Sequence, residues 1–146
     1  MSSDLGKSVT CAIGEYLALA ELLKKGHEAF IAQGPTQKGW DIAVIKQDRE
    51  FEKIIRIQVK TIDWPKDNRR TVTLSNGMHF DYLIVILLDL AQTHSRYLVL
   101  SKSEIDTLAS MENPGRKGKS RSWYVAKDFV ATDAVGVHEN KWEKIK

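Results

Sequence analysis

Apolar residues recur at helical spacing near the start of the chain. Between residues 6 and 25 they return every three or four positions, which is typical of one face of an α-helix. Ser8 is a candidate N-cap, and Gly26 is a natural stop after two lysines that suit the negative end of the helix dipole. We predict a helix over 6–25, whose apolar positions include Val9, Ile13, Tyr16, Leu17, Ala20 and Leu23.

Apolar and polar residues then alternate, which is typical of half-buried strands. The run Tyr82–Leu88 is continuously apolar and predicts a central strand covered on both faces. A second helix is predicted at 103–111, with Ser101 or Ser103 as its cap, and a last helical turn at Trp142. The other predicted strands are 27–32, 41–46, 51–62, 70–74 and 96–100, of which 41–46 and 51–62 form an antiparallel hairpin. Residues 113–122 read as a basic loop, and 122–129 have no clear preference.

This order of elements predicts a single domain over residues 1–146. It is an α/β or α+β fold, in which helices cover the faces of one sheet. A chain of 146 residues is long enough to bury a core of this kind.

Composition narrows the setting of the protein. Hydrophobic residues make up 42% and charged residues 28%, as in ordinary globular domains, and the net charge of +3 permits a polyanionic partner without requiring one. The single cysteine, Cys11, excludes an internal disulfide and fits a reducing compartment. Tyr82–Leu88 is far shorter than the roughly 20 residues of a membrane-spanning helix. We therefore expect a cytoplasmic protein with no membrane partner.

Three polar residues interrupt the predicted hairpin near one end of the sheet. Side chains alternate along a strand, so Gln58 and Lys60 point to the same face, opposite Ile57 and Val59. If the two strands pair, Asp41 lies beside them. Such a pattern is compatible with a merely solvated strand face, or with a polar site at the end of the sheet.

The predicted first helix contributes a fourth polar residue. Glu15 belongs to a stripe that otherwise contains Ala12, Leu19 and Leu22. A buried carboxylate needs a partner, because burying an unpaired charge is costly. That partner is a cation or metal, a salt bridge to Lys60, or water at the edge of the helix.

These residues occur in an order that resembles the PD-(D/E)XK nuclease superfamily. The similarity rests on GEYLALAELLKKGH, GWDIAV and IRIQVKT in 7–61, and is nearest to the branch of Holliday-junction resolvases and small restriction-type endonucleases. Trp40 stands where the family has proline, and Gln58 where it usually has a carboxylate. The resemblance implies a restriction-endonuclease-like core, with a central mixed sheet of four to five strands flanked by helices in αβββαβ order. It also implies catalytic roles for Glu15, Asp41, Gln58 and Lys60.

The implied chemistry is metal-dependent hydrolysis of phosphodiester bonds in DNA. Carboxylate oxygens of Asp41 and Glu15 suit Mg²⁺, for which Mn²⁺ could substitute. The Gln58 amide oxygen and the Val59 carbonyl are further candidate ligands. Lys60 could orient the attacking water or stabilise developing charge.

Basic residues supply candidate contacts to nucleic acid. The segment after the predicted hairpin and the basic loop contain Lys66, Arg69, Arg70, Arg116, Lys117, Lys119 and Arg121. A solvated charge run is the alternative for the basic loop. Residues 115–120 only approximate a P-loop, since position 113 is asparagine and a helix precedes it.

The sequence therefore predicts a magnesium-dependent endodeoxyribonuclease that acts as a homodimer through elements after Leu74. The alternatives are a nuclease acting on RNA, and a catalytically inactive binding module of the same fold, such as a regulator or a toxin-neutralising immunity protein. Duplex, junction or single-strand preference is left open.

Overall fold

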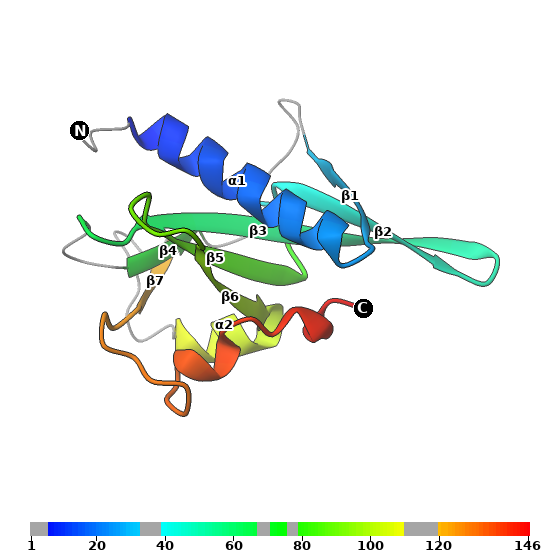
Figure 1. Ribbon diagram of the computed structural model, residues 1–146. Helices are drawn as coiled ribbons and strands as arrows, with labels where there is room; N and C mark the ends of the chain where they lie inside the picture. Colours follow the sequence, from blue (N-terminus) through cyan, green and yellow to red (C-terminus); the bar gives the residue numbers. More distant parts are fainter. Residues whose placement is uncertain (1–5, 33–38, 67–70, 76–78, 110–119) are drawn as a thin grey trace.

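A five-stranded sheet forms the centre of the protein in the computed structural model, which describes residues 6–32, 39–66, 71–75, 79–109 and 120–146. The strand order is β1-β2-β3-β5-β6, with β3 and β5 parallel and the other neighbours antiparallel. A two-stranded ribbon of β4 and β7 lies beside it (Figure 1). The elements are α1 (Lys7–Lys24), β1 (Glu28–Ile31), β2 (Ile42–Asp48), β3 (Phe51–Asp63), β4 (Thr71–Ser75), β5 (Tyr82–Leu88), β6 (Arg96–Ser101), α2 (Lys102–Leu108), β7 (Ser120–Tyr124), η2 (Gly136–His138) and η3 (Trp142–Lys144).

The predicted mixed sheet with flanking helices is confirmed, with one departure from the expected αβββαβ order. Among the described residues between β3 and β5 there is no helix, and β4 occupies that connection instead. The predicted basic loop at 113–122 lies largely outside the described residues, and its last three residues open β7. Ser120–Tyr124 pairs with Thr71–Ser75, so a tertiary partner decides the structure of a segment without a clear local preference.

Each face of the sheet has its own hydrophobic cluster. On one face, α1 and the η3 segment pack against apolar side chains of the sheet such as Ile57 of β3 and Ile84 of β5. Trp142 and Ile145 belong to the same cluster. The opposite face is covered by α2, the β4–β7 ribbon and the segment around Phe129. β5 contributes buried residues to both clusters, as its continuous apolar run predicted.

The face by which α1 packs differs from the one its large apolar residues indicate. Val9, Tyr16 and Leu23 are exposed. The buried residues recur every four positions as Thr10, Gly14, Ala18 and Leu22, and the first three of them are small. A Cβ added at Gly14 would lie 1.8 Å from the Thr61 Oγ1 atom. The helix therefore approaches β3 closely at Gly14, while Ile13, Leu17 and Leu19 pack at the margin of the core and Val9, Tyr16 and Leu23 face solvent. The predicted N-cap is also wrong, because the helix begins after Gly6 without a side-chain cap.

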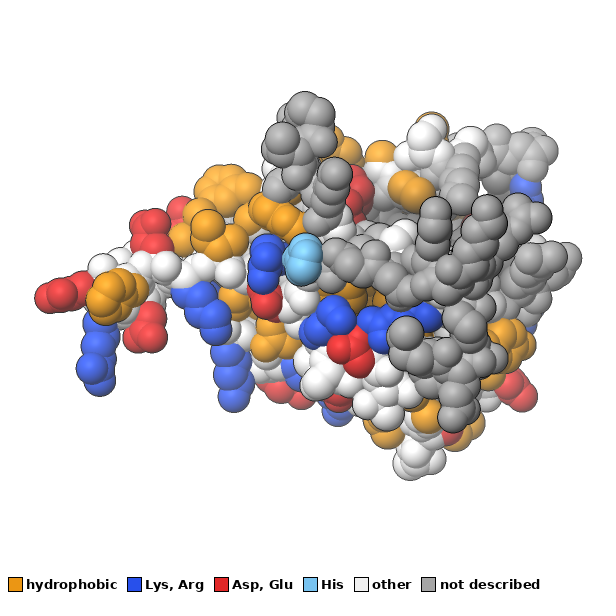
Figure 2. Space-filling model, turned by 180° about the vertical axis from the view of Figure 1, so that it is seen from behind, with side chains coloured by type: hydrophobic (Ala, Val, Ile, Leu, Met, Phe, Trp, Pro, Cys, Tyr) orange, Lys and Arg blue, Asp and Glu red, His pale blue; other side chains and the backbone are white. Residues whose placement is uncertain are grey.

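The hairpin of β2 and β3 extends beyond β1 as an arm (Figures 1 and 2). Its tip is formed by the pair Asp48 and Phe51, with Arg49 in the left-handed region at a φ of 57°. Both basic and acidic side chains lie on it, as Figure 2 shows, and Phe51 is exposed. The arm thus has little net charge and no core of its own.

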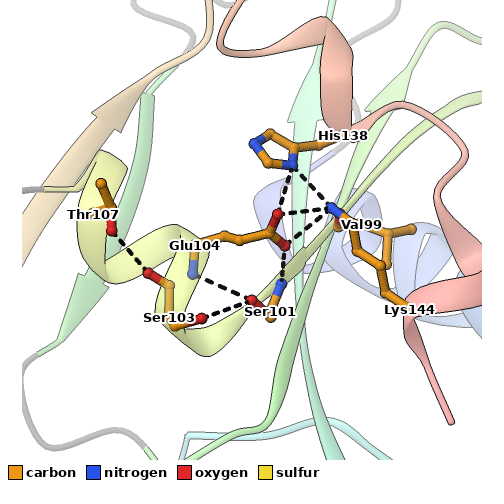
Figure 3. A network of polar contacts seen from close by, with 7 residues as sticks. All are labelled: Val99, Ser101, Ser103, Glu104, Thr107, His138 and Lys144. Atoms are coloured by element: carbon orange, nitrogen blue, oxygen red, sulfur yellow. Dashed lines mark hydrogen bonds and ion pairs between the residues drawn. The ribbon is translucent and has the colours of Figure 1, made fainter.

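A polar network fastens the C-terminal segment to α2 and β6 (Figure 3). Ser101 and Glu104 form a capping box at the start of α2, as the candidate cap Ser101 predicted. Lys144 Nζ donates to both Glu104 carboxylate oxygens at 3.0 and 3.1 Å, to the Val99 carbonyl at 3.0 Å, and to His138 Nδ1 at 3.0 Å. Burial and the neighbouring lysine lower the pKa of His138, which favours the neutral imidazole that can accept this bond. The histidine is a buried packing residue.

Within the described residues, no helix is long and apolar enough to cross a membrane.

Candidate active site

The candidate site begins where β2 and β3 part. The last register pair joins Ile42 to Ile57, and the Asp41 amide donates to the Ile57 carbonyl at 2.7 Å. Beyond this point β3 continues with β5 on one side only. On the other side of β3, the Asp41 carboxylate replaces a strand partner, because its Oδ2 accepts a hydrogen bond from the Val59 N–H at 2.9 Å. A carboxylate that satisfies a strand-edge amide is held in one orientation.

Gln58 lies against the same carboxylate. Its Nε2 donates to Asp41 Oδ2 at 3.0 Å and to the Val59 carbonyl at 3.3 Å, and the residue is 6% exposed. The Gln58 amide nitrogen thus bridges Asp41 Oδ2 and the Val59 carbonyl oxygen. Both groups are among the metal ligands predicted from the sequence, as is the Gln58 amide oxygen. For its oxygen to join them as a ligand, the amide group must turn over.

Glu15 approaches Asp41 from α1. Partial burial, repulsion by the Asp41 charge and a hydrogen bond to the Asp41 side chain raise the pKa of Glu15 to about 7. Two carboxyl groups in contact cannot both ionise without cost unless a cation or proton lies between them. The carboxyl pair therefore favours a bound proton or a bound cation near neutral pH.

Lys60 lies two residues after Gln58, on the same face of β3, and is half-buried. No hydrogen bond or ion pair joins it to another residue in the described part of the chain. The alternative of a Glu15–Lys60 salt bridge is thus not realised in this structure. The ammonium group remains available for a ligand.

All four predicted residues line one cleft of about 500 Å³. Helix α1 supplies one wall through Cys11 and Glu15, and β3 supplies the floor. A further wall, which the sequence did not predict, is formed by β4 through Thr71, Val72 and Thr73. Nothing in the local sequence signals that β4 folds back beside Lys60, since this depends on its pairing with β7 some 49 positions later in the chain.

The donor set fits a hard divalent cation. Among the described residues, no group of three histidine, cysteine, aspartate or glutamate side chains could hold a metal by itself. Two carboxylates, however, meet beside the Val59 carbonyl and the Gln58 amide, and Mg²⁺ characteristically combines one or two protein carboxylates with waters and substrate oxygens. Asp41, Glu15, the Val59 carbonyl and a turned Gln58 amide would hold such an ion.

The predicted nucleic-acid contacts fall into three groups. Lys66 is exposed in the turn after β3, close in sequence to the cleft residues. Arg121 is mostly buried and forms an ion pair with Asp106 of α2, which fixes β7 against that helix. Arg69, Arg70, Arg116, Lys117 and Lys119 lie outside the described residues. A role for any of them with nucleic acid stays a prediction.

The close contact of Gly14 in α1 with Thr61 in β3 predicts that substitutions at these two positions affect stability jointly. Gly14→Ala should destabilise the protein by about 1–3 kcal/mol, because the new methyl group overlaps the Thr61 hydroxyl, and should displace Glu15. Thr61→Gly in the same chain removes every Thr61 atom that the methyl group meets, so the double variant should recover much of the lost stability. Chemical denaturation of the two single variants and the double variant measures the coupling. Independent, additive effects would contradict the contact.

Glu15 generates a prediction about pH. Its pKa is raised in the folded state, so the stability that comes with its protonation is full below about pH 4.5 and is lost as pH rises towards 7. In metal-free protein, Glu15→Gln should therefore be more stable than wild type by about 1–2 kcal/mol near pH 8, allowing for solvent screening, with the difference shrinking towards pH 4. Denaturation at several pH values tests this, with Glu52→Gln on the exposed arm as the control. A pH-independent difference would contradict it.

Comparison with known proteins supports the fold alone. No family model matches the chain, and no curated protein matches its sequence. Among solved structures, the bacterial homing endonuclease I-Ssp6803I is similar, with a TM-score of 0.59 and 17% identity over 96% of this chain and 91% of that one. The chain therefore has a mixed α/β fold of a kind that also occurs in a nuclease.

Proposed function

We propose that this protein is a metal-dependent endonuclease of DNA, with a site of the PD-(D/E)XK type. The observation that carries the proposal is the convergence of Glu15, Asp41, Gln58 and Lys60 in one cleft from separate elements. A solvated strand face would not explain why Asp41 and Gln58 bond to each other or why Glu15 meets Asp41. The similar structure of a homing endonuclease adds support at the level of the fold.

Each residue then has a chemical role. When bound, a divalent cation would offset phosphate charge and lower the pKa of an attacking water. Asp41 is oriented for this task by the Val59 amide, and Glu15 supplies a second carboxylate once its proton leaves. Lys60 donates hydrogen bonds to the reacting phosphate and stabilises the charge that develops on its oxygens.

The first test is cleavage of supercoiled plasmid with Mg²⁺ or Mn²⁺. Wild type should nick the plasmid, and Lys60→Ala should lower the rate by about 100-fold or more because it removes a charged donor from the reacting phosphate. Asp41→Ala should be inactive. Lys53→Ala, an exposed lysine on the same strand outside the cleft, is the matched control. Full activity in a folded Asp41→Ala protein would overturn the proposal.

The same assay distinguishes the other candidate functions. Cleavage of RNA but not of DNA would identify a ribonuclease. Nucleic-acid binding without cleavage under any of these metal conditions would favour an inactive binding module.

Gln58 generates a separate prediction. Gln58→Glu brings a third carboxylate to the Asp41 and Glu15 pair, so it should lower the Mg²⁺ concentration needed for half-maximal cleavage, while Gln58→Ala should raise it. The maximal rate of Gln58→Glu should fall, because added negative charge opposes the phosphate. A metal titration of the three proteins measures both quantities. Three coincident curves would remove Gln58 from the ligand set.

Homodimerisation is part of the same proposal, since cutting both strands of a duplex requires two sites of this size. Exposed apolar residues in the described C-terminal part, such as Val130 and Val137, are candidates for the contact. Sedimentation at micromolar concentration, with and without DNA, should show a dimer. A monomer under both conditions would contradict it.

A further inference from the structure

The β4–β7 ribbon has two chemically different faces. Val72, Leu74 and Trp123 are buried and join the core. The outward positions form three register pairs, and each member of each pair carries a hydroxyl group. The outward pairs are Thr71 with Tyr124, Thr73 with Ser122, and Ser75 with Ser120. We call these six residues the hydroxyl face.

The fold makes little use of these hydroxyl groups. Thr73 Oγ1 and Ser122 Oγ lie 3.3 Å apart, and no other side-chain hydrogen bond joins the hydroxyl face to the described residues. Thr71, Thr73 and Ser75 are exposed, and the Tyr124 side chain is 58% exposed. The face carries neither a charge nor an aliphatic side chain. It therefore presents donors and acceptors that the described residues leave available.

The hydroxyl face begins inside the candidate active site. Thr71 and Thr73 line the same cleft as Asp41, Gln58 and Lys60. From Thr71 the paired strands run four residue steps, or about 13 Å, to Ser75 and Ser120. Duplex DNA rises about 3.4 Å per nucleotide along its axis, so the ribbon spans the rise of about four nucleotides.

We propose that the hydroxyl face binds the phosphodiester backbone of the nucleic acid next to the scissile phosphate. This inference rests on the proposed function, and it assigns a substrate-binding surface to a ribbon outside the four predicted site residues. Phosphate oxygens only accept hydrogen bonds, whereas each hydroxyl can turn to donate one. Because the face contains no carboxylate, it does not repel the strand. Because it contains no cation, it positions the strand without adding salt-dependent affinity.

The test is binding of fluorescein-labelled duplex DNA, about two helical turns long, by the 146-residue chain in EDTA. Fluorescence anisotropy then measures affinity without cleavage. The combined substitution Thr71→Val, Thr73→Val and Ser122→Ala removes three hydroxyl groups and keeps residues that a strand tolerates. Affinity should fall about tenfold or more on duplexes of unrelated sequence, while the slope of log affinity against log salt stays unchanged. Thr107→Val, an exposed threonine on α2 that contributes nothing to the cleft, is the matched control.

Single substitutions at Thr73 make the test independent of the triple variant. Thr73→Lys should tighten binding and steepen the salt slope by about one, and Thr73→Glu should weaken binding. Unchanged affinity in the triple variant and in Thr73→Glu would overturn the proposal. So would a loss confined to one DNA sequence, because it would indicate that the ribbon reads base edges. Failure of wild type to bind DNA would overturn it as well.

The outcome is separable from that of the proposed function. If wild type never cleaves DNA but the triple variant loses binding, the hydroxyl face stands and the endonuclease proposal fails. If wild type cleaves and the triple variant binds and cleaves equally well, only the hydroxyl face is rejected.

Discussion

The hydrogen bond from the Val59 amide to the Asp41 carboxylate is the contact on which the candidate site depends. A strand that continues past its neighbour leaves an amide that needs an acceptor. Asp41 supplies that acceptor just before β2 begins, where the pairing of β2 with β3 ends. The fold thereby holds a charged group at this end of the hairpin. Gln58 adds a second donor to the same oxygen. A structural requirement of β3 and a chemical requirement of the site are met by the same carboxylate.

Glu15 reaches this carboxylate only because α1 lies unusually near β3. Gly14 faces Thr61 with no room for a methyl group, and Ala18 and Thr10 continue the same buried line. The resulting contact between two acids is unfavourable when both are ionised. Close packing at Gly14 therefore brings the neighbouring Glu15 carboxyl against Asp41, and a proton or a cation can relieve the repulsion between them. Such tension between packing and charge is common at functional sites.

The sequence predicted most elements, because their patterns are local. Alternation in β2 and β3 and the apolar run of β5 identify strands whatever their neighbours are. It also brought Asp41 and Gln58 together, since hairpin register follows from the short turn. The packing face of α1 was misjudged, because small residues pack closely without an apolar signal. The β4 wall was missed for another reason: its position depends on β7, which is distant in the chain.

The parallel pairing of β3 with β5 has a consequence for how the protein folds. β2 and β3 form a hairpin with a short loop, so they can associate early, whereas β5 reaches β3 only after the chain has crossed over through β4. Asp41, just before β2, and Val59 of β3 belong to the hairpin side of the cleft, whereas Thr71 and Thr73 belong to the crossover. The order expected from chain connectivity therefore places the Asp41–Val59 contact before the β4 wall of the cleft. A nascent chain would thus present ionisable groups without the surface that limits what reaches them.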